Sequence, residues 1–195
     1  MWYIYRTRWC IDMTRARPRK KTGPEELAGQ CLMAFIEAGT LDLSLDQLSA
    51  KVGISKRMLV HYFGGREAIE ESALSILENR LREQFSSACF PPGVSLATVV
   101  EALWERTTSP KSRGVLLLVM DVSKRAWSGS ARARAFYQEQ QRLWVELLMH
   151  YLPDRLAVEE LLQLFQGAVL AYLITGDGEA GRRSLRRFLS GKATR

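Results

Sequence analysis

Residues 43–63 read LSLDQLSAKVGISKRMLVHYF, a pattern typical of two short helices joined at a glycine. Ser44 and Gln47 have the spacing of a capping box, which predicts a helix that begins directly after Ser44. Gly53 can adopt the left-handed conformation that a tight turn needs. Ser55 is then placed to cap a second helix. The stretch therefore predicts a helix-turn-helix unit.

The charged residues of the second short helix are predicted to face away from the core. A rotation of about 100° per residue places Leu59 and Phe63, with Tyr62 beside them, on one face. Arg57 and His61 lie together on the opposite face, which Met58 and Val60 flank. Lys56 lies in the first turn, from where its long side chain reaches a phosphate or a base edge. We expect this face to enter the major groove of DNA.

The composition is that of a soluble globular protein with a basic surface. The chain has 195 residues, of which 47% are hydrophobic and 25% are charged, and its formal net charge is +7. This length suits one large domain, or a small domain attached to a larger one. Clustered Lys and Arg gain affinity by releasing counterions from phosphates, so a polyanion is the first partner to test.

Cysteine and histidine are too sparse to indicate catalysis or metal binding. Cys10, Cys31 and Cys89 are scattered and odd in number, which indicates neither a disulfide framework nor a thiolate metal site. His61 and His150 are the only histidines and lie far apart. No Ser-His-carboxylate grouping and no glycine-rich phosphate loop stands out. We therefore expect no catalytic residue, no metal and no cofactor, and a protein that is not an enzyme.

The first 23 residues are predicted to form a flexible basic arm. Arg15, Arg17, Arg19, Lys20 and Lys21 follow one another with no acidic residue between them. Two interpretations stay open, a solvated tail and an arm that touches phosphates or enters the minor groove.

Nothing in the sequence indicates export or a membrane span. Arg6 and Arg8 interrupt the apolar start of the chain before a secretory segment forms, and the longest apolar run, 115–120, is far too short to cross a bilayer. We expect a cytoplasmic protein with no membrane partner. Met13 begins a more ordinary opening than Met1, so we hypothesise that translation starts at Met13.

The rest of the chain has helical periodicity, so the predicted fold class is all-α. We expect a helix-turn-helix domain over 24–70 and a helical ligand-binding and dimerisation domain over 71–195. The expected helices are 24–39, 45–53, 56–63, a long helix from Arg66 toward Pro91, Leu96 to Thr107, Pro110 to Trp127, Ala131 to Leu152, Leu156 to Thr175 and Gly178 to Leu189.

The segment LSLDQLSAKVGISKRMLVHYFGGREAIEESAL resembles the N-terminal domain of TetR/AcrR-family transcriptional regulators. The resemblance is specific across Pro24 to Leu77, and the remaining chain agrees with that family only in helix number, length and size. It implies a homodimeric repressor that binds a palindromic DNA operator. It also implies that a small-molecule effector of the C-terminal domain releases the operator.

The resemblance extends to single positions. Ser44 stands where the family has a phosphate-contacting Thr, Lys56 matches its recognition-helix Lys, and Arg66 matches a basic residue that clamps a phosphate. Two positions depart from the family, since Val60 replaces a phosphate-binding Tyr and Arg57 replaces a small residue. The predicted DNA-contacting residues are Ser44, Ser55, Lys56, Arg57, Met58, Val60, His61, Tyr62 and Arg66.

Two further sites are predicted in the C-terminal half. Large apolar side chains there are either ordinary core or the lining of an effector pocket; the candidates are Trp104, Met120, Trp127, Phe136, Tyr137, Trp144 and Phe165. The segment ELLQLFQGAVLAYLITG is apolar almost all round and needs a further partner, which predicts a four-helix homodimer interface. Its expected residues are Leu164, Gly167, Ala168, Ala171, Leu185, Phe188 and Leu189.

Two other classes of protein compete with a DNA-binding regulator. A basic amphipathic protein lying on anionic membranes would account for the charge, although not for the capped Gly53 turn. A small all-helical enzyme would need a nucleophile or an acid/base pair in its C-terminal half.

Overall fold

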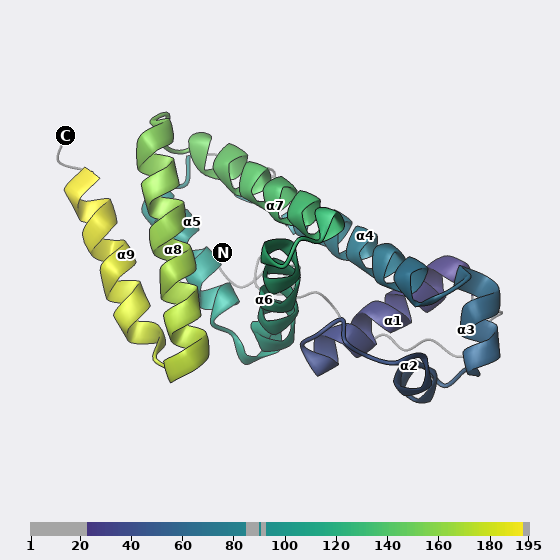
Figure 1. Cartoon of the computed structure of the whole chain (residues 1–195). Coiled ribbons are helices and arrows are strands. Elements are labelled where there is room, and N and C mark those ends of the chain that lie inside the picture. The colour runs from purple at the N-terminus through teal and green to yellow at the C-terminus, as the bar shows by residue number, and fades with distance from the viewer. Residues whose placement is uncertain (1–22, 85–89, 91–92, 193–195) are drawn as a thin grey trace.

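The computed structural model describes residues 23–84, 90 and 93–192, and in these ranges every regular element is a helix (Figure 1). The predicted all-α class is therefore confirmed. The expected basic arm lies outside the described residues, apart from Gly23. The helices are α1 (Pro24–Ala38), α2 (Leu45–Val52), α3 (Lys56–Phe63), α4 (Arg66–Gln84), α5 (Leu96–Thr107), the 3-10 helix η2 (Pro110–Ser112), α6 (Arg113–Trp127), α7 (Ala131–Met149), α8 (Arg155–Thr175) and α9 (Gly178–Lys192).

Local sequence signals set the bounds of α2 and α3. The backbone N–H of Ser44 donates to Gln47 Oε1 at 2.8 Å and the N–H of Gln47 donates to Ser44 Oγ at 3.2 Å, so the capping box is complete. Gly53 ends α2 with φ of 77°, a conformation that costs glycine little. Ser55 Oγ accepts the N–H of Met58 at 3.3 Å and starts α3. These caps confirm the predicted helix-turn-helix.

Several expected helices have different bounds in the structure. The helix expected from Pro110 begins as the short η2 and becomes α-helical only at Arg113. The N–H of Ser112 bonds to the carbonyl of Ser109 at 2.9 Å, which is the tighter 3-10 pattern. α7 ends at Met149 rather than at Leu152, α8 begins at Arg155 rather than at Leu156, and α9 continues to Lys192 rather than ending at Leu189.

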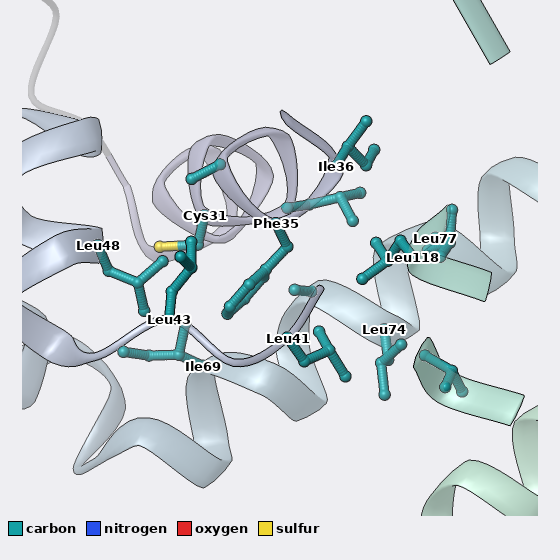
Figure 2. Packing of buried hydrophobic residues seen from close by; sticks show 14 of the residues in the cluster. Cys31, Phe35, Ile36, Leu41, Leu43, Leu48, Ile69, Leu74, Leu77 and Leu118 are labelled. Carbon is teal, nitrogen blue, oxygen red and sulfur yellow. The ribbon is translucent and has the colours of Figure 1, made fainter. Parts of the chain in front are cut away.

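A first hydrophobic cluster joins the helix-turn-helix to its supporting helices (Figure 2). Phe35 of α1, Leu48 of α2 and Ile69 of α4 belong to this cluster, and so does Leu59 of α3. All four side chains are fully buried. Each such side chain contributes about 1.5–3 kcal/mol by leaving water. Leu118 of α6 belongs to the same cluster, so the core continues past the domain boundary expected at residue 70, which falls inside α4.

A second hydrophobic cluster holds α5, α7, α8 and α9 together at the other end of the molecule (Figure 1). Trp104 of α5 is 1% exposed, and its indole N–H donates to the carbonyl of Gly178 at 3.1 Å. The hydroxyl of Tyr172 donates to the carbonyl of Thr108 at 2.8 Å. These bonds fix the polar ends of two large side chains inside an otherwise apolar core.

Helix α6 connects the two halves and lies against the C-terminal end of α1. A Cβ on Gly114 of α6 would lie 2.4 Å from the carbonyl oxygen of Ile36, a distance that no side chain tolerates. Only glycine lets the two helices approach this closely. The position of α6 is therefore coupled directly to the helix that supports α2 and α3.

Candidate nucleic-acid interface

The outer face of α3 carries basic side chains that are exposed to water. Lys56, Arg57 and His61 are exposed, while Leu59 on the opposite face is fully buried. α3 lies at the end of the molecule opposite α8 and α9 (Figure 1). The charged side chains of α3 therefore face outward and Leu59 faces the core, as helical periodicity predicted.

Lys56 and Arg57 differ in their surroundings. Lys56 Nζ lies 3.0 Å from Asp46 Oδ2 of α2. Both side chains are more than half exposed, and such surface pairs contribute at most about 1 kcal/mol, so a phosphate can replace Asp46. Arg57 forms no ion pair with any residue that the structure describes. Its guanidinium is the cation of α3 that is available without breaking an existing contact.

Three apolar or aromatic side chains of α3 also face outward. Met58 is 40%, Val60 38% and Tyr62 39% exposed, and none of them belongs to either cluster of buried residues. Tyr62, expected beside Leu59, is thus at the edge of the buried face. Its ring packs edge-on against His61, with the ring centres 5.6 Å apart.

The two serines predicted to contact DNA act as helix caps. Ser44 and Ser55 each accept a backbone N–H, and both side chains remain exposed. Their positions at the starts of α2 and α3 are close to the positive ends of the helix dipoles, which favour an anion.

Arg66, expected to contact a phosphate, is bonded to groups of its own chain, and its side chain remains 38% exposed. Its Nη2 donates to the carbonyl of Leu41 at 3.1 Å and to Asp42 Oδ1 at 3.0 Å, and its Nε lies 2.9 Å from Glu70 Oε1. The hydrogen bond to Asp42 is the largest cause that raises the pKa of Arg66. Arg66 therefore connects α4 to the loop that precedes α2 through hydrogen bonds and ion pairs.

Two residues of α6, Asp121 and Arg125, bond to the same loop and to α4. Asp121 Oδ2 accepts the N–H of Leu41 at 2.9 Å and the hydroxyl of Thr40 at 3.1 Å. Arg125 pairs with Asp121 at 3.2 Å and with Glu70 at 3.1 Å. Sequence reasoning missed both residues, although their spacing of four residues on a helix is a recognisable ion-pair signal.

The predicted effector-pocket residues are divided between the two hydrophobic clusters and the surface. Phe136 is buried in the first cluster, while Trp104 and Phe165 are buried in the second, their rings edge-to-face with centres 5.6 Å apart. Trp144 packs against Phe165. The remaining candidates are exposed: Met120 37%, Tyr137 42% and Trp127 90%.

A half-open groove of about 300 Å³ lies between α5 and α9. Trp104 is the predicted pocket residue that lines it, together with Leu185 and Leu189. Glu101 stands at its edge and pairs with Arg182 at 2.9 Å and Arg186 at 3.1 Å. Two of the arginines of α9 thus form ion pairs with α5.

The predicted dimer residues divide into an inner and an outer group. Leu185 is 2% exposed and packs with Phe188 and Leu189 in the second cluster. Ala168 faces α9 of the same chain, since its Cβ is 3.0 Å from the position that a Cβ on Gly181 would take. Leu164 packs against the same cluster. Gly167 and Ala171 are exposed.

The outer face of α8 exposes three large apolar side chains. Leu156 is 67%, Leu170 50% and Ile174 76% exposed. Leu170 and Ile174 follow the helical period with Gly167 and form one apolar stripe, and the exposed Glu160 and Gln163 separate this stripe from Leu156 on the same face. α8 is also the one helix among the described residues that is long and apolar enough to cross a membrane by length and composition. Its other face is buried in the second cluster, as in a helix of a folded domain.

The described residues contain no group of three or more His, Cys, Asp or Glu side chains arranged to hold a metal ion. The thiol of Cys31 is buried among apolar side chains, and burial raises its pKa to about 11. A thiol with so high a pKa is neutral and unreactive at physiological pH.

This architecture is the fold of TetR-family transcriptional regulators. A TetR-family transcriptional regulator from Streptomyces coelicolor is similar over 87% of this chain and 82% of its own, with a TM-score of 0.67 and 18% sequence identity. A TetR transcriptional regulator from Rhodococcus sp. RHA1 is similar over 84% of this chain and 94% of its own, with a TM-score of 0.53 and 16% identity. No family model matches the sequence, and no curated protein matches it.

Proposed function

We propose that this protein is a DNA-binding transcriptional regulator that represses transcription from a palindromic operator and responds to a small molecule. The observation that carries the proposal is the outer face of α3, where Lys56, Arg57 and His61 are exposed on a helix whose opposite face is buried. The net charge of +7 supports binding to a polyanion. The TetR-family fold supports the same class of protein.

DNA binding by this face requires α3 to be held rigidly. Leu59 anchors α3 in the first cluster, and Ser55 and Gly64 cap its two ends. A recognition helix fixed in this way enters the major groove with its N-terminal residues toward the base edges. Lys56 and Arg57 occupy that first turn.

We propose that the outer face of α8 is the homodimer interface. Apolar side chains as exposed as Ile174 and Leu156 lose free energy in water and gain it against a matching surface. A second copy of the chain offers the same face, and Gly167 and Ala171 permit a close helix approach. Two recognition helices related by a two-fold axis read a palindromic operator.

The response to an effector is proposed to pass through α6. Asp121 accepts the N–H of Leu41 in the loop before α2, and Arg125 lies 3.5 Å from Asp42 of the same loop. Gly114 fits against α1. A ligand that displaces α6 therefore changes the position of α2 and α3. We propose a small-molecule effector bound in the C-terminal half of a cytoplasmic protein, with no catalytic step and no cofactor.

The test of this function is selection of genomic fragments by the purified protein. We expect enrichment of a short palindromic sequence whose half-sites lie about one helical turn apart. Enrichment of unrelated fragments with equal affinity would overturn the proposal. Co-sedimentation with anionic liposomes, together with failure to enrich any sequence, would support the membrane-surface alternative instead.

A further inference from the structure

Met58 is an apolar side chain on the face of α3 that carries the exposed basic residues. It is 40% exposed and lies outside the two clusters of buried residues described above. Its backbone N–H bonds to Ser55 Oγ at 3.3 Å, so the N-cap fixes its position in the first turn. The free protein therefore presents to water a flexible thioether that contributes little to its own core.

Met58 is next to the available cation of α3. At about 100° per residue, Arg57, His61 and Met58 follow one another around the outer face within about 100° of rotation. Arg57 and Met58 are adjacent in sequence, so they lie at nearly the same height along the helix. Two neighbouring positions of the first turn thus offer one cationic and one apolar group.

The major groove contains one apolar group, the 5-methyl of thymine. The sulfur of methionine is a weak hydrogen-bond acceptor and not a donor. Phosphate oxygens are also acceptors, so Met58 forms no hydrogen bond to a phosphate. Against a thymine methyl it buries apolar surface, whereas cytosine offers an amino donor that the thioether would leave unpaired. The chemistry of Met58 therefore matches thymine and disfavours cytosine.

Val60 and Tyr62 are exposed to a similar extent but are placed less well for this contact. Val60 lies two residues, or about half a turn, further from the N-terminus than Met58, on the flank of α3 nearest Phe63. The ring of Tyr62 packs against His61. Of the three positions, Tyr62 is the one closest to the buried Leu59 around the helix. Recognition helices contact base edges mainly with their N-terminal residues, which favours Met58.

We propose that Met58 reads the 5-methyl group of a thymine in each operator half-site, beside the base pair that Arg57 contacts. This inference rests on the proposed DNA-binding function. It names the chemical group of the operator, the thymine methyl, that Met58 is expected to select.

The test uses the full-length protein and the operator selected from genomic fragments, with each thymine of one half-site replaced in turn by deoxyuridine. Deoxyuridine pairs as thymine does and lacks only the methyl group. We expect affinity to fall by about fourfold at one position, the effect of exposing one buried methyl-sized group. Replacing that thymine by 5-methylcytosine, with guanine opposite, should weaken binding less than replacing it by cytosine.

Variants at exposed positions assign the effect to Met58. Met58→Ala should bind the thymine and deoxyuridine operators equally, Met58→Leu should keep the preference, and Val60→Ala should keep it as well. Unchanged thermal unfolding of each variant shows that the fold is intact. Indifference of the wild-type protein to deoxyuridine at every position, or an undiminished preference in Met58→Ala, would overturn the inference. If no operator is enriched at all, it is the proposed function that fails.

Discussion

Arg57 is the residue of α3 best placed to read a base. It is exposed and unpaired among the described residues, whereas Lys56 already has Asp46 at 3.0 Å. A guanidinium binds the O6 and N7 of guanine through two parallel hydrogen bonds, which an ammonium group does less specifically. The two neighbouring cations are therefore expected to have different roles.

We predict that Arg57→Ala costs about 1–3 kcal/mol on the preferred operator and relaxes the choice of one base pair in each half-site. Lys56→Ala is the matched control, and it should weaken binding to all sequences more evenly. Competition binding with all four base pairs at each operator position measures both effects. Equal weakening of every operator variant by Arg57→Ala would show that Arg57 contacts a phosphate only.

Asp42 is a residue whose charge stabilises the folded loop before α2. The hydrogen bond from Arg66, followed by the charge of Arg125, holds the pKa of Asp42 below its ordinary value. A carboxyl group whose pKa is lower in the folded chain contributes stability above its unfolded pKa of about 3.9. That contribution is lost as the pH falls through the folded value.

We therefore predict that Asp42→Asn lowers the free energy of unfolding at neutral pH and that the difference from wild type shrinks below about pH 4. Asp42 is largely exposed, so solvent screening keeps the effect small. Urea unfolding between pH 3 and pH 7 measures the difference. A gap of constant size across this range would mean that the charge of Asp42 does not stabilise the loop.

Helices α1 and α6 lie in close contact because residue 114 is a glycine. Gly114 faces the Ile36 carbonyl at the C-terminal end of α1, and an added Cβ would overlap it. Gly29, in the middle of α1, has open space where a Cβ would be built. The two glycines therefore give opposite expectations for the same substitution.

We predict that Gly114→Ala destabilises the protein by about 1–3 kcal/mol through overpacking. Gly29→Ala should stabilise it by up to about 1 kcal/mol, because alanine loses less backbone entropy in a helix. Chemical unfolding of the two variants measures both values. Equal stability of the two variants would show that α6 moves away from α1 at little cost, and then α6 is a poor route for a signal to α2 and α3.

For the whole molecule, the outer face of α8 matters because it exposes three large apolar side chains, Leu156, Leu170 and Ile174. Ile174 is 76% and Leu156 67% exposed at opposite ends of this helix. The inner face of α8 faces α9, so a charge at Ala168 would disturb the protomer itself. A test of dimerisation has to use the outer residues.

We predict that Ile174→Glu dissociates the homodimer at micromolar concentration, because it places a charge in an apolar interface. Trp127→Glu is the matched control, since Trp127 is also an exposed apolar residue but lies at the end of α6. Sedimentation velocity gives the oligomeric state of each variant. A wild-type monomer, or a dimer unaffected by Ile174→Glu, would rule out this interface.

Short-range sequence signals were enough to predict α2, α3 and the side of α3 that faces outward. The Ser44 capping box, the Gly53 turn and the Ser55 cap each act within a few residues, and the burial of Leu59 follows from helical periodicity. Such short-range signals specify backbone conformation wherever the segment is placed.

The partners of the long side chains depend on how helices distant in the sequence pack together. Arg66 bonds to Asp42 across 24 positions of the chain, and Asp121 bonds to Thr40 across 81. Likewise, packing buried Trp104 and left Trp127 exposed, although both are tryptophans on amphipathic helices. A periodic pattern gives the direction of a side chain about its own helix, but the neighbour it meets depends on how helices distant in sequence pack together.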